Sequence, residues 1–182
     1  MNALASLEQD HVMIREVLDA LERFVTRIES QRHVDKQTLE RFATFFVTFA
    51  DIHHAIKEEQ VLFPALERHG APWDHGPLAH ARREHRQERY FMRTMMQLAT
   101  QERDADEESR RVLVSELTEF IQSLRDHLQL EEAEVFPFAE SMAPSAQRDL
   151  ETRLDRFDAT PPSDSELPKM QALAQTLKDG LT

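Results

Sequence analysis

The sequence predicts an all-α protein, an antiparallel up-down four-helix bundle followed by a short C-terminal helix and tail. Three observations support this prediction. Only three glycines occur among the 182 residues. The body of the chain is rich in Leu, Ala, Glu, Gln and Arg, which favour helix. Apolar residues also recur at alternating spacings of four and three over long stretches, which is typical of the buried face of a bundle helix.

The first helix is predicted from an apolar stripe that continues without a break for more than four turns. The members of this stripe are Leu7, His11, Ile14, Leu18, Leu21, Val25 and Ile28. The polar stretch 30–36 ends it. A second helix is expected over residues 35–68, and its inner side carries Leu39, Phe42, Phe46, Phe49 and Ile56.

Two further helices complete the predicted bundle. The segment 69–77 is rich in Gly and Pro and forms a turn. The third helix is expected over 77–103, with its proline in the first turn. The fourth is expected over 106–142, with a stripe of Leu113, Leu117, Phe120, Leu124, His127 and Glu131.

Two prolines lie inside helical patterns, Pro64 in the second helix and Pro137 in the fourth. A proline inside a helix removes one backbone hydrogen bond and kinks the helix. Their equivalent placement predicts two matching bends near one end of the bundle.

The chain is expected to divide into the bundle, residues 1–142, and a C-terminal part, residues 143–182. In the second part the sequence predicts a short helix over 146–157 and a linker over 160–168. A weak amphipathic helix is expected over the last dozen residues. No chemistry is predicted for this tail.

Composition excludes several classes of function. The net charge of −12 argues against nucleic acid or an anionic membrane as a partner, because both require a basic face. Without cysteine there is no disulfide, thiolate metal site or iron–sulfur cluster. The N-terminus lacks the features of a secretory signal, and the longest nearly apolar run, 42–50, is too short to cross a bilayer. We therefore expect a soluble, cytoplasmic protein.

A fourteen-residue pattern occurs twice, as HAIKEEQVLFPALE from His54 and as HLQLEEAEVFPFAE from His127. Both copies share the histidine, Glu at +4 and +5, Phe at +9, Pro at +10 and Glu at +13. A histidine and a glutamate four apart project from one face of a helix, so both can bind one metal. The pairs are His54 with Glu58 and His127 with Glu131. Two pairs in a chain without cysteine predict a paired metal site with nitrogen and oxygen ligands.

Two more histidines are expected at the same level of the bundle. The spacing from His11 to His54 is 43 residues, and that from His85 to His127 is 42. In antiparallel helices joined by short connections, these spacings bring one histidine from each helix to nearly equal depth. Inward glutamates beside four such histidines predict a metal centre, because unpaired buried carboxylates are costly.

This arrangement, H–HxxxE–H–HxxxE across four helices with EExxxFP following in each HxxxE copy, resembles the hemerythrin-like (HHE cation-binding) domain. The resemblance covers roughly residues 5–142 and includes REH at 83–85 after GP at 76–77. It implies a non-haem di-iron centre, with manganese as the less favoured metal. The resemblance implies His11, His54, His85 and His127 as terminal ligands. It also implies Glu58 and Glu131 as carboxylates that bridge the two irons.

The chain departs from oxygen-carrying hemerythrins in one respect. These proteins have a fifth histidine one helical turn from the third-helix ligand, where this chain has Ala81. His80, five residues before His85, points in a different direction from the helix, and Glu88, three residues after His85, could offer a carboxylate instead. For each of these two residues, both interpretations stay open, as a metal ligand or as a residue outside the site. This departure argues against simple oxygen carriage.

Three other residues have two interpretations each. His53 is rotated by about 100° from His54 on the helix, which favours helix packing over ligation. Glu59 and Glu132 follow the ligand glutamates. They either hydrogen-bond to ligand imidazoles and orient them, or are solvated charges.

Two functions fit this centre. In the first, the protein binds or senses O2, NO or a related small oxidant, and Phe42, Phe46, Phe49 and Phe120 wall the centre. In the second, it is a di-iron enzyme of peroxide disproportionation or iron-centre repair. The sequence does not separate binding from turnover, and it does not specify a protein partner.

Overall fold

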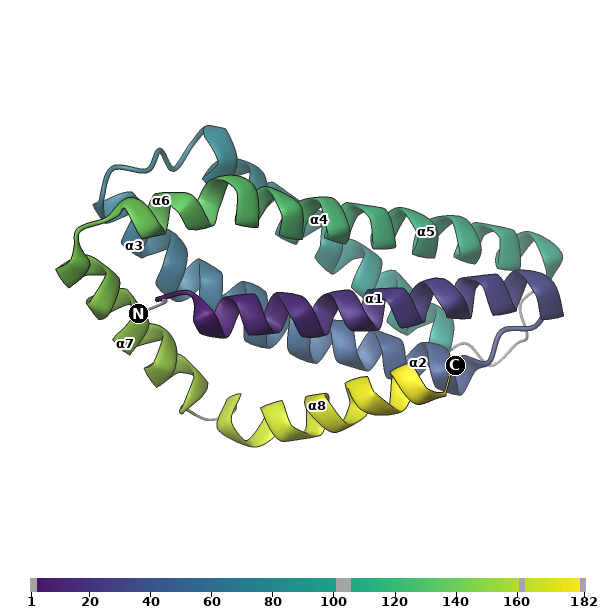
Figure 1. Ribbon diagram of the computed structural model, residues 1–182. Coiled ribbons are helices and arrows are strands. Elements are labelled where there is room, and N and C mark those ends of the chain that lie inside the picture. Colours follow the sequence, from purple (N-terminus) through teal and green to yellow (C-terminus); the bar gives the residue numbers. More distant parts are fainter. Residues whose placement is uncertain (1–2, 101–105, 161–162, 181–182) are drawn as a thin grey trace.

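The computed structural model describes residues 3–100, 106–160 and 163–180 (Figure 1). These residues are helical apart from turns and short connections, and they contain no strand, so the all-α class is confirmed. None of the helices in these ranges has both the length and the apolar character needed to span a membrane.

Four long helical stretches lie alongside one another (Figure 1). The first is α1 (Ala5–Gln31) and the third is α4 (Gly76–Ala99). The second joins α2 (Lys36–Phe45), η1 (Phe46–Ala55), η2 (Glu58–Leu62) and α3 (Phe63–Arg68). The fourth joins α5 (Glu107–Leu130), η3 (Glu131–Val135) and α6 (Phe136–Ser141). Helix α1 packs on α5, α5 on α4, and α4 on α2.

The helix boundaries agree with the local chemistry of the sequence. The Asp35 carboxylate caps α2 by accepting hydrogen bonds from the backbone of Gln37 and Thr38, and Asp106 caps α5 in the same way. Arg32 ends α1 in the left-handed conformation, with φ of 52°. The expected end of the third helix at residue 103 lies outside the described residues.

The two internal prolines are each preceded by a π-helical turn. The N–H of Phe63 bonds to the carbonyl of Glu58, and the N–H of Phe136 bonds to the carbonyl of Glu131. Each bond spans five residues, one more than in an α-helix. The next residue is a proline that donates no bond. A π-helical segment therefore begins at the glutamate of each repeated motif, six residues before the proline, and in the second stretch the longer π-helical segment η1 precedes it. The two matching bends stay a prediction.

The C-terminal part differs from the sequence prediction. Helix α7 (Pro144–Asp158) is slightly longer than expected, and α8 (Ser163–Asp179) includes most of the predicted linker. The linker prediction is wrong for residues 163–168, while residues 161–162 lie outside the described ranges. Helix α8 runs beside α1, α2 and η1 and buries Met170, Ala174 and Leu177 (Figure 1). This apolar stripe outweighs the single backbone bond lost at Pro168.

The buried apolar residues form two clusters. The larger contains the aromatic residues of α2, η1 and α5, and the smaller contains Leu4, Leu7 and the residues around α3 and α6. On α1, Leu7 belongs to one cluster and Ile14 to the other, and His11 lies between them. A buried polar layer thus separates the two apolar clusters.

Candidate metal centre

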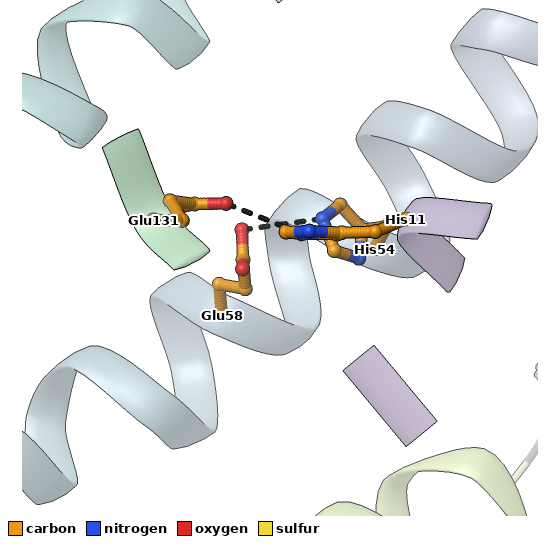
Figure 2. A group of neighbouring side chains, drawn as sticks. All are labelled: His11, His54, Glu58 and Glu131. Atoms are coloured by element: carbon orange, nitrogen blue, oxygen red, sulfur yellow. Dashed lines mark ion pairs between the residues drawn. The ribbon is translucent and has the colours of Figure 1, made fainter. Parts of the chain in front are cut away.

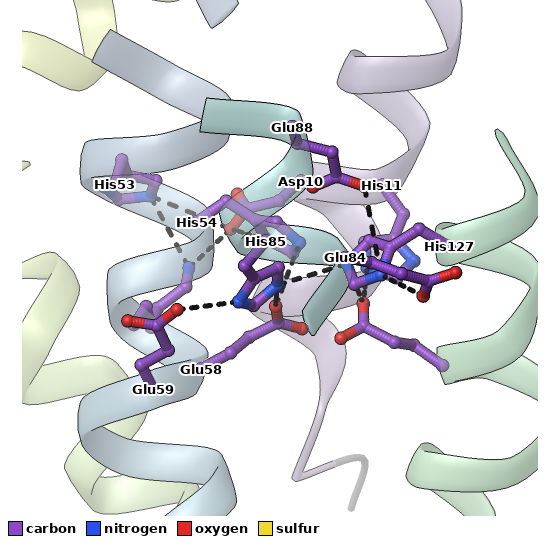
Figure 3. Close-up of polar contacts among 12 residues, drawn as sticks. Asp10, His11, His53, His54, Glu58, Glu59, Glu84, His85, Glu88 and His127 are labelled. Atoms are coloured by element: carbon purple, nitrogen blue, oxygen red, sulfur yellow. Dashed lines mark hydrogen bonds and ion pairs between the residues drawn. The ribbon is translucent and has the colours of Figure 1, made fainter. Parts of the chain in front are cut away.

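Six side chains from the four long helical stretches meet in this polar layer (Figures 2 and 3). All six are at most 2% exposed. They are His11 on α1, His54 on η1, Glu58 at the start of η2, His85 on α4, His127 on α5 and Glu131 at the start of η3. The structure therefore brings together the six residues that the family resemblance implied as ligands.

The six residues form two overlapping groups that could each hold a cation. In the first group His11, His54, Glu58 and Glu131 offer ligand atoms within 4.8 Å of one another. The second group combines the same two glutamates with His85 and His127. The two candidate cation positions therefore share Glu58 and Glu131.

The distances within the two groups are nearly the same. The Nε2 atoms of His11 and His127 lie 3.4 and 3.5 Å from Oε2 of Glu131. The Nε2 atoms of His54 and His85 lie 3.6 and 3.4 Å from Oε2 of Glu58. Each carboxylate therefore faces one imidazole from each group.

The unpaired atoms of this layer fit a cation. Both carboxylate oxygens of Glu58 and of Glu131 are buried without a hydrogen bond, as are Nε2 of His11 and Nε2 of His54. Nε2 of His85 and Nε2 of His127 converge to 3.1 Å. Buried polar atoms without partners destabilise a fold by about 1–3 kcal/mol each. A pair of cations would supply the missing partner to all of them.

In each of the four candidate ligand histidines, the outer ring nitrogen, Nδ1, contacts a carboxylate. The Nδ1–H of His11 donates to Glu132 (2.9 Å), and that of His54 donates to Asp10 (3.2 Å). The Nδ1–H of His85 donates to Glu59 (2.9 Å), and that of His127 donates to Glu84 (3.0 Å). Such a bond fixes the tautomer and leaves Nε2 free to bind a metal. The orienting interpretation of Glu59 and Glu132 thus agrees with the structure.

Each copy of the repeated motif also contacts a histidine of a neighbouring helix. Glu59 and Phe63, at +5 and +9 in the first copy, hydrogen-bond to and stack on His85, with ring centroids 5.7 Å apart. In the second copy, Glu132 and Phe136 do the same for His11, at 5.1 Å. The two halves of the site are therefore related by an approximate twofold symmetry.

Two aromatic residues besides the four of the predicted wall contact the site directly. Phe42, Phe46, Phe49 and Phe120 are fully buried, but they belong to the larger apolar cluster. The rings that stack on candidate ligands are Phe63 and Phe136. Their equivalent positions in the repeated motif were the signal that could have identified them.

Sequence reasoning missed a buried lysine beside the centre. The Lys57 side chain has no exposed surface, and its ammonium lies 2.6 Å from Asp10 and 3.0 Å from Asp158 at the end of α7. It also donates to Nε2 of His53 at 3.5 Å. His53 stacks on Phe49 and is outside both ligand groups. The predicted packing role of His53 therefore fits the structure, and the tail contributes a charged residue to the surroundings of the site.

His80 and Glu88, the two possible additional ligands on the third helix, belong to neither of the two ligand groups. His80 is half exposed and pairs with Glu84 at 3.2 Å. Glu88 is 3% exposed, and its Oε1 has no hydrogen bond and lies 4.0 Å from Nδ1 of His127. Burial raises the pKa of the Glu88 carboxyl.

Without a cation, protonated imidazoles compensate the buried carboxylates. Burial alone would lower the pKa of His85, but the nearby carboxylates of Glu58 and Glu59 outweigh it and raise that pKa to about 9. Burial would also lower the pKa of His127, but the charges of Glu131 and Glu88 outweigh burial and hold this pKa well above its usual value. Burial would raise the pKa of Glu58, but the charges of His54 and His85 hold it well below its usual range.

Fold and site together define an all-helical protein with a buried pair of candidate cation positions. A model of the hemerythrin HHE cation-binding domain matches residues 2–139. The chain therefore belongs to the hemerythrin HHE cation-binding family, as its motifs suggested. Comparisons with curated proteins and with solved structures gave no significant match.

The raised pKa of His85 predicts how the stability of the metal-free chain depends on pH. A histidine with a raised folded-state pKa stabilises the fold fully below its unfolded pKa of 6.5, and this contribution is lost as the pH rises through about 9. Urea unfolding of chelator-treated protein should therefore show a free energy of unfolding that falls over this range. His33→Gln, which removes an exposed histidine, should leave the slope unchanged. A flat profile would contradict protonation of the buried layer.

Asp158 is predicted to stabilise the fold through Lys57. Asp158→Ala leaves the buried ammonium with Asp10 as its remaining carboxylate partner, so unfolding in urea should become easier by about 1–3 kcal/mol. Asp155→Ala, on an exposed position of the same helix, is the matched control. Equal effects of the two substitutions would show that the pair with Lys57 contributes nothing.

Proposed function

We propose that this chain binds two non-haem iron ions within an antiparallel four-helix bundle, and that it uses them to bind or sense O2, NO or a related small oxidant. The proposal is supported most directly by the two four-residue groups that share Glu58 and Glu131. Each position would receive two imidazoles and two bridging carboxylates.

The ligand chemistry favours iron. Imidazole suits iron, whereas manganese prefers carboxylate, carbonyl and water ligands. Four imidazoles and two carboxylates form a nitrogen-rich set for a pair of ions. Iron held in this way can change between its divalent and trivalent states, which is the chemistry required to respond to an oxidant.

Burial of the site favours a very small ligand. All six candidate ligands are at most 2% exposed, and apolar clusters lie on both sides of them. An organic substrate would have to displace packed side chains, whereas a diatomic gas or peroxide is small enough to enter through small side-chain movements. The same walls exclude bulk water from the centre.

The test of this function is exposure of the reduced protein to O2. Protein loaded anaerobically with ferrous iron should develop new ligand-to-metal absorption bands when O2 or NO is added. Failure of both gases to change the spectrum of an iron-loaded sample would contradict the proposal. Sustained O2 evolution from peroxide would instead identify the alternative, an enzyme of peroxide disproportionation.

The roles of individual ligands predict different metal contents. Glu58→Ala or Glu131→Ala should lower the iron content at both positions, because each carboxylate is shared. His11→Ala should leave the His85 and His127 position partly filled, while His80→Ala, at a half-exposed position, should retain both ions. Elemental analysis of the purified variants measures these contents. A loss in His80→Ala equal to that in the glutamate variants would show that His80 is a ligand.

A further inference from the structure

The approximate twofold symmetry of the site extends to the residues around the ligands. Asp10 and Glu84 each precede a candidate ligand, His11 or His85, and each accepts a bond from a histidine of the repeated motif. Four residues after His11 and His85 lie Arg15 and Arg89. Arg15 pairs with Glu132 at 2.6 Å, and Arg89 pairs with Glu59 at 3.0 Å. In these contacts the two halves of the site correspond.

The symmetry breaks at two buried charged residues. Lys57 lies three residues after His54, and the equivalent residue after His127 is Leu130. Glu88 lies three residues after His85, and the equivalent residue after His11 is Ile14. One half of the site therefore gains a buried cation, and the other half gains a buried carboxyl group.

On the His11 and His54 side, the orienting carboxylate is shared with a positive charge. Asp10 accepts from His54 at 3.2 Å and from the Lys57 ammonium at 2.6 Å. The shorter contact goes to the full charge, which neutralises Asp10 and weakens its effect on the imidazole. Lys57 thus places a positive charge behind the orienting carboxylate of this position.

On the His85 and His127 side, no such compensation accompanies the orienting carboxylate. The ion-pair partners of Glu84 in the described part of the chain are two histidines, His80 and His127. Glu88 adds a second carboxyl group, 4.0 Å from Nδ1 of His127 (Figure 3). The hydrogen bond from His127 to Glu84 increases the basicity of this imidazole and therefore its affinity for a metal, and Glu88, which makes no hydrogen bond to His127, adds the attraction of its charge for a bound cation.

We infer that the two metal positions are unequal, and that the position formed by His85 and His127 with the shared glutamates binds the first cation. The inference rests on the proposed metal-binding function and adds an order of filling to it. Changes in the residues behind metal ligands alter affinity by about 10–100-fold. We therefore expect the two binding steps to differ by at least about tenfold.

Stepwise titration with cobalt(II) tests the order of filling. This ion accepts the same nitrogen and oxygen ligands as iron(II), and its absorption reports binding. Metal-free protein should show a tight step and a weak step. His54→Ala removes a ligand specific to the first group and should retain the tight step, whereas His127→Ala should retain the weak step.

A charge variant tests the cause of the difference. Glu88→Gln keeps the size of the side chain but removes its charge, so the tight step should weaken by about tenfold while the weak step is unchanged. Glu119→Gln removes one negative charge from an exposed position of α5 and should change neither step.

Several results would overturn the inference. Equal steps in the unmodified protein would do so, as would a tight step that survives His127→Ala and is lost in His54→Ala. If Glu88→Gln fails to fold, the comparison of the two histidine variants still decides the order. Absence of any cobalt or iron binding would overturn the proposed function itself, whereas two equal bound ions would contradict only the order of filling.

Discussion

The burial of two carboxylates, Glu58 and Glu131, is the constraint on which the rest of the structure depends. Charged groups are buried in proteins only when other charges or hydrogen bonds compensate them. Here four imidazoles surround the two carboxylates, one from each long helical stretch, and this polar layer divides the apolar core in two. Protonated imidazoles can compensate the carboxylates without a metal, and bound cations would replace those protons. Metal binding and folding therefore act on the same set of groups.

The repeated motif meets this constraint by serving two helices at once. Its glutamate at +4 enters the shared pair, while its residues at +5 and +9 hold and cover the histidine of a neighbouring helix. Each π-helical turn begins at that glutamate and ends where the phenylalanine and proline follow. In both copies, the segment EExxxFP therefore combines a π-helical turn, a glutamate of the shared pair and the two residues that contact the neighbouring histidine.

Features that depend on local periodicity could be predicted from the sequence. The stripe through Leu7, His11 and Ile14 is buried as expected, and the i, i+4 pairs face the same layer. Helix α8 was not predicted over residues 163–168, because Pro and Ser favour a linker by propensity. Tertiary packing of Met170, Ala174 and Leu177 outweighs that propensity. The six candidate ligands could be predicted because the spacing of histidines and glutamates identifies each of them. Phe63 and Phe136 stack on histidines of other helices, and the local sequence pattern does not show which helix each one contacts.

The buried lysine shows most clearly where local reasoning ends. In the repeated motif Lys57 occupies a position equivalent to Leu130, and a lysine on a helix is ordinarily solvated. Its burial depends on Asp158, which is 101 residues away in sequence and lies beyond the predicted end of the bundle at residue 142. The same contact gives Asp10 a second partner besides His54. The ion pair between Lys57 and Asp158 thus adds a positive charge beside one half of the candidate metal centre only. The repeated motif is almost symmetric in sequence, but the site that it forms is electrostatically asymmetric.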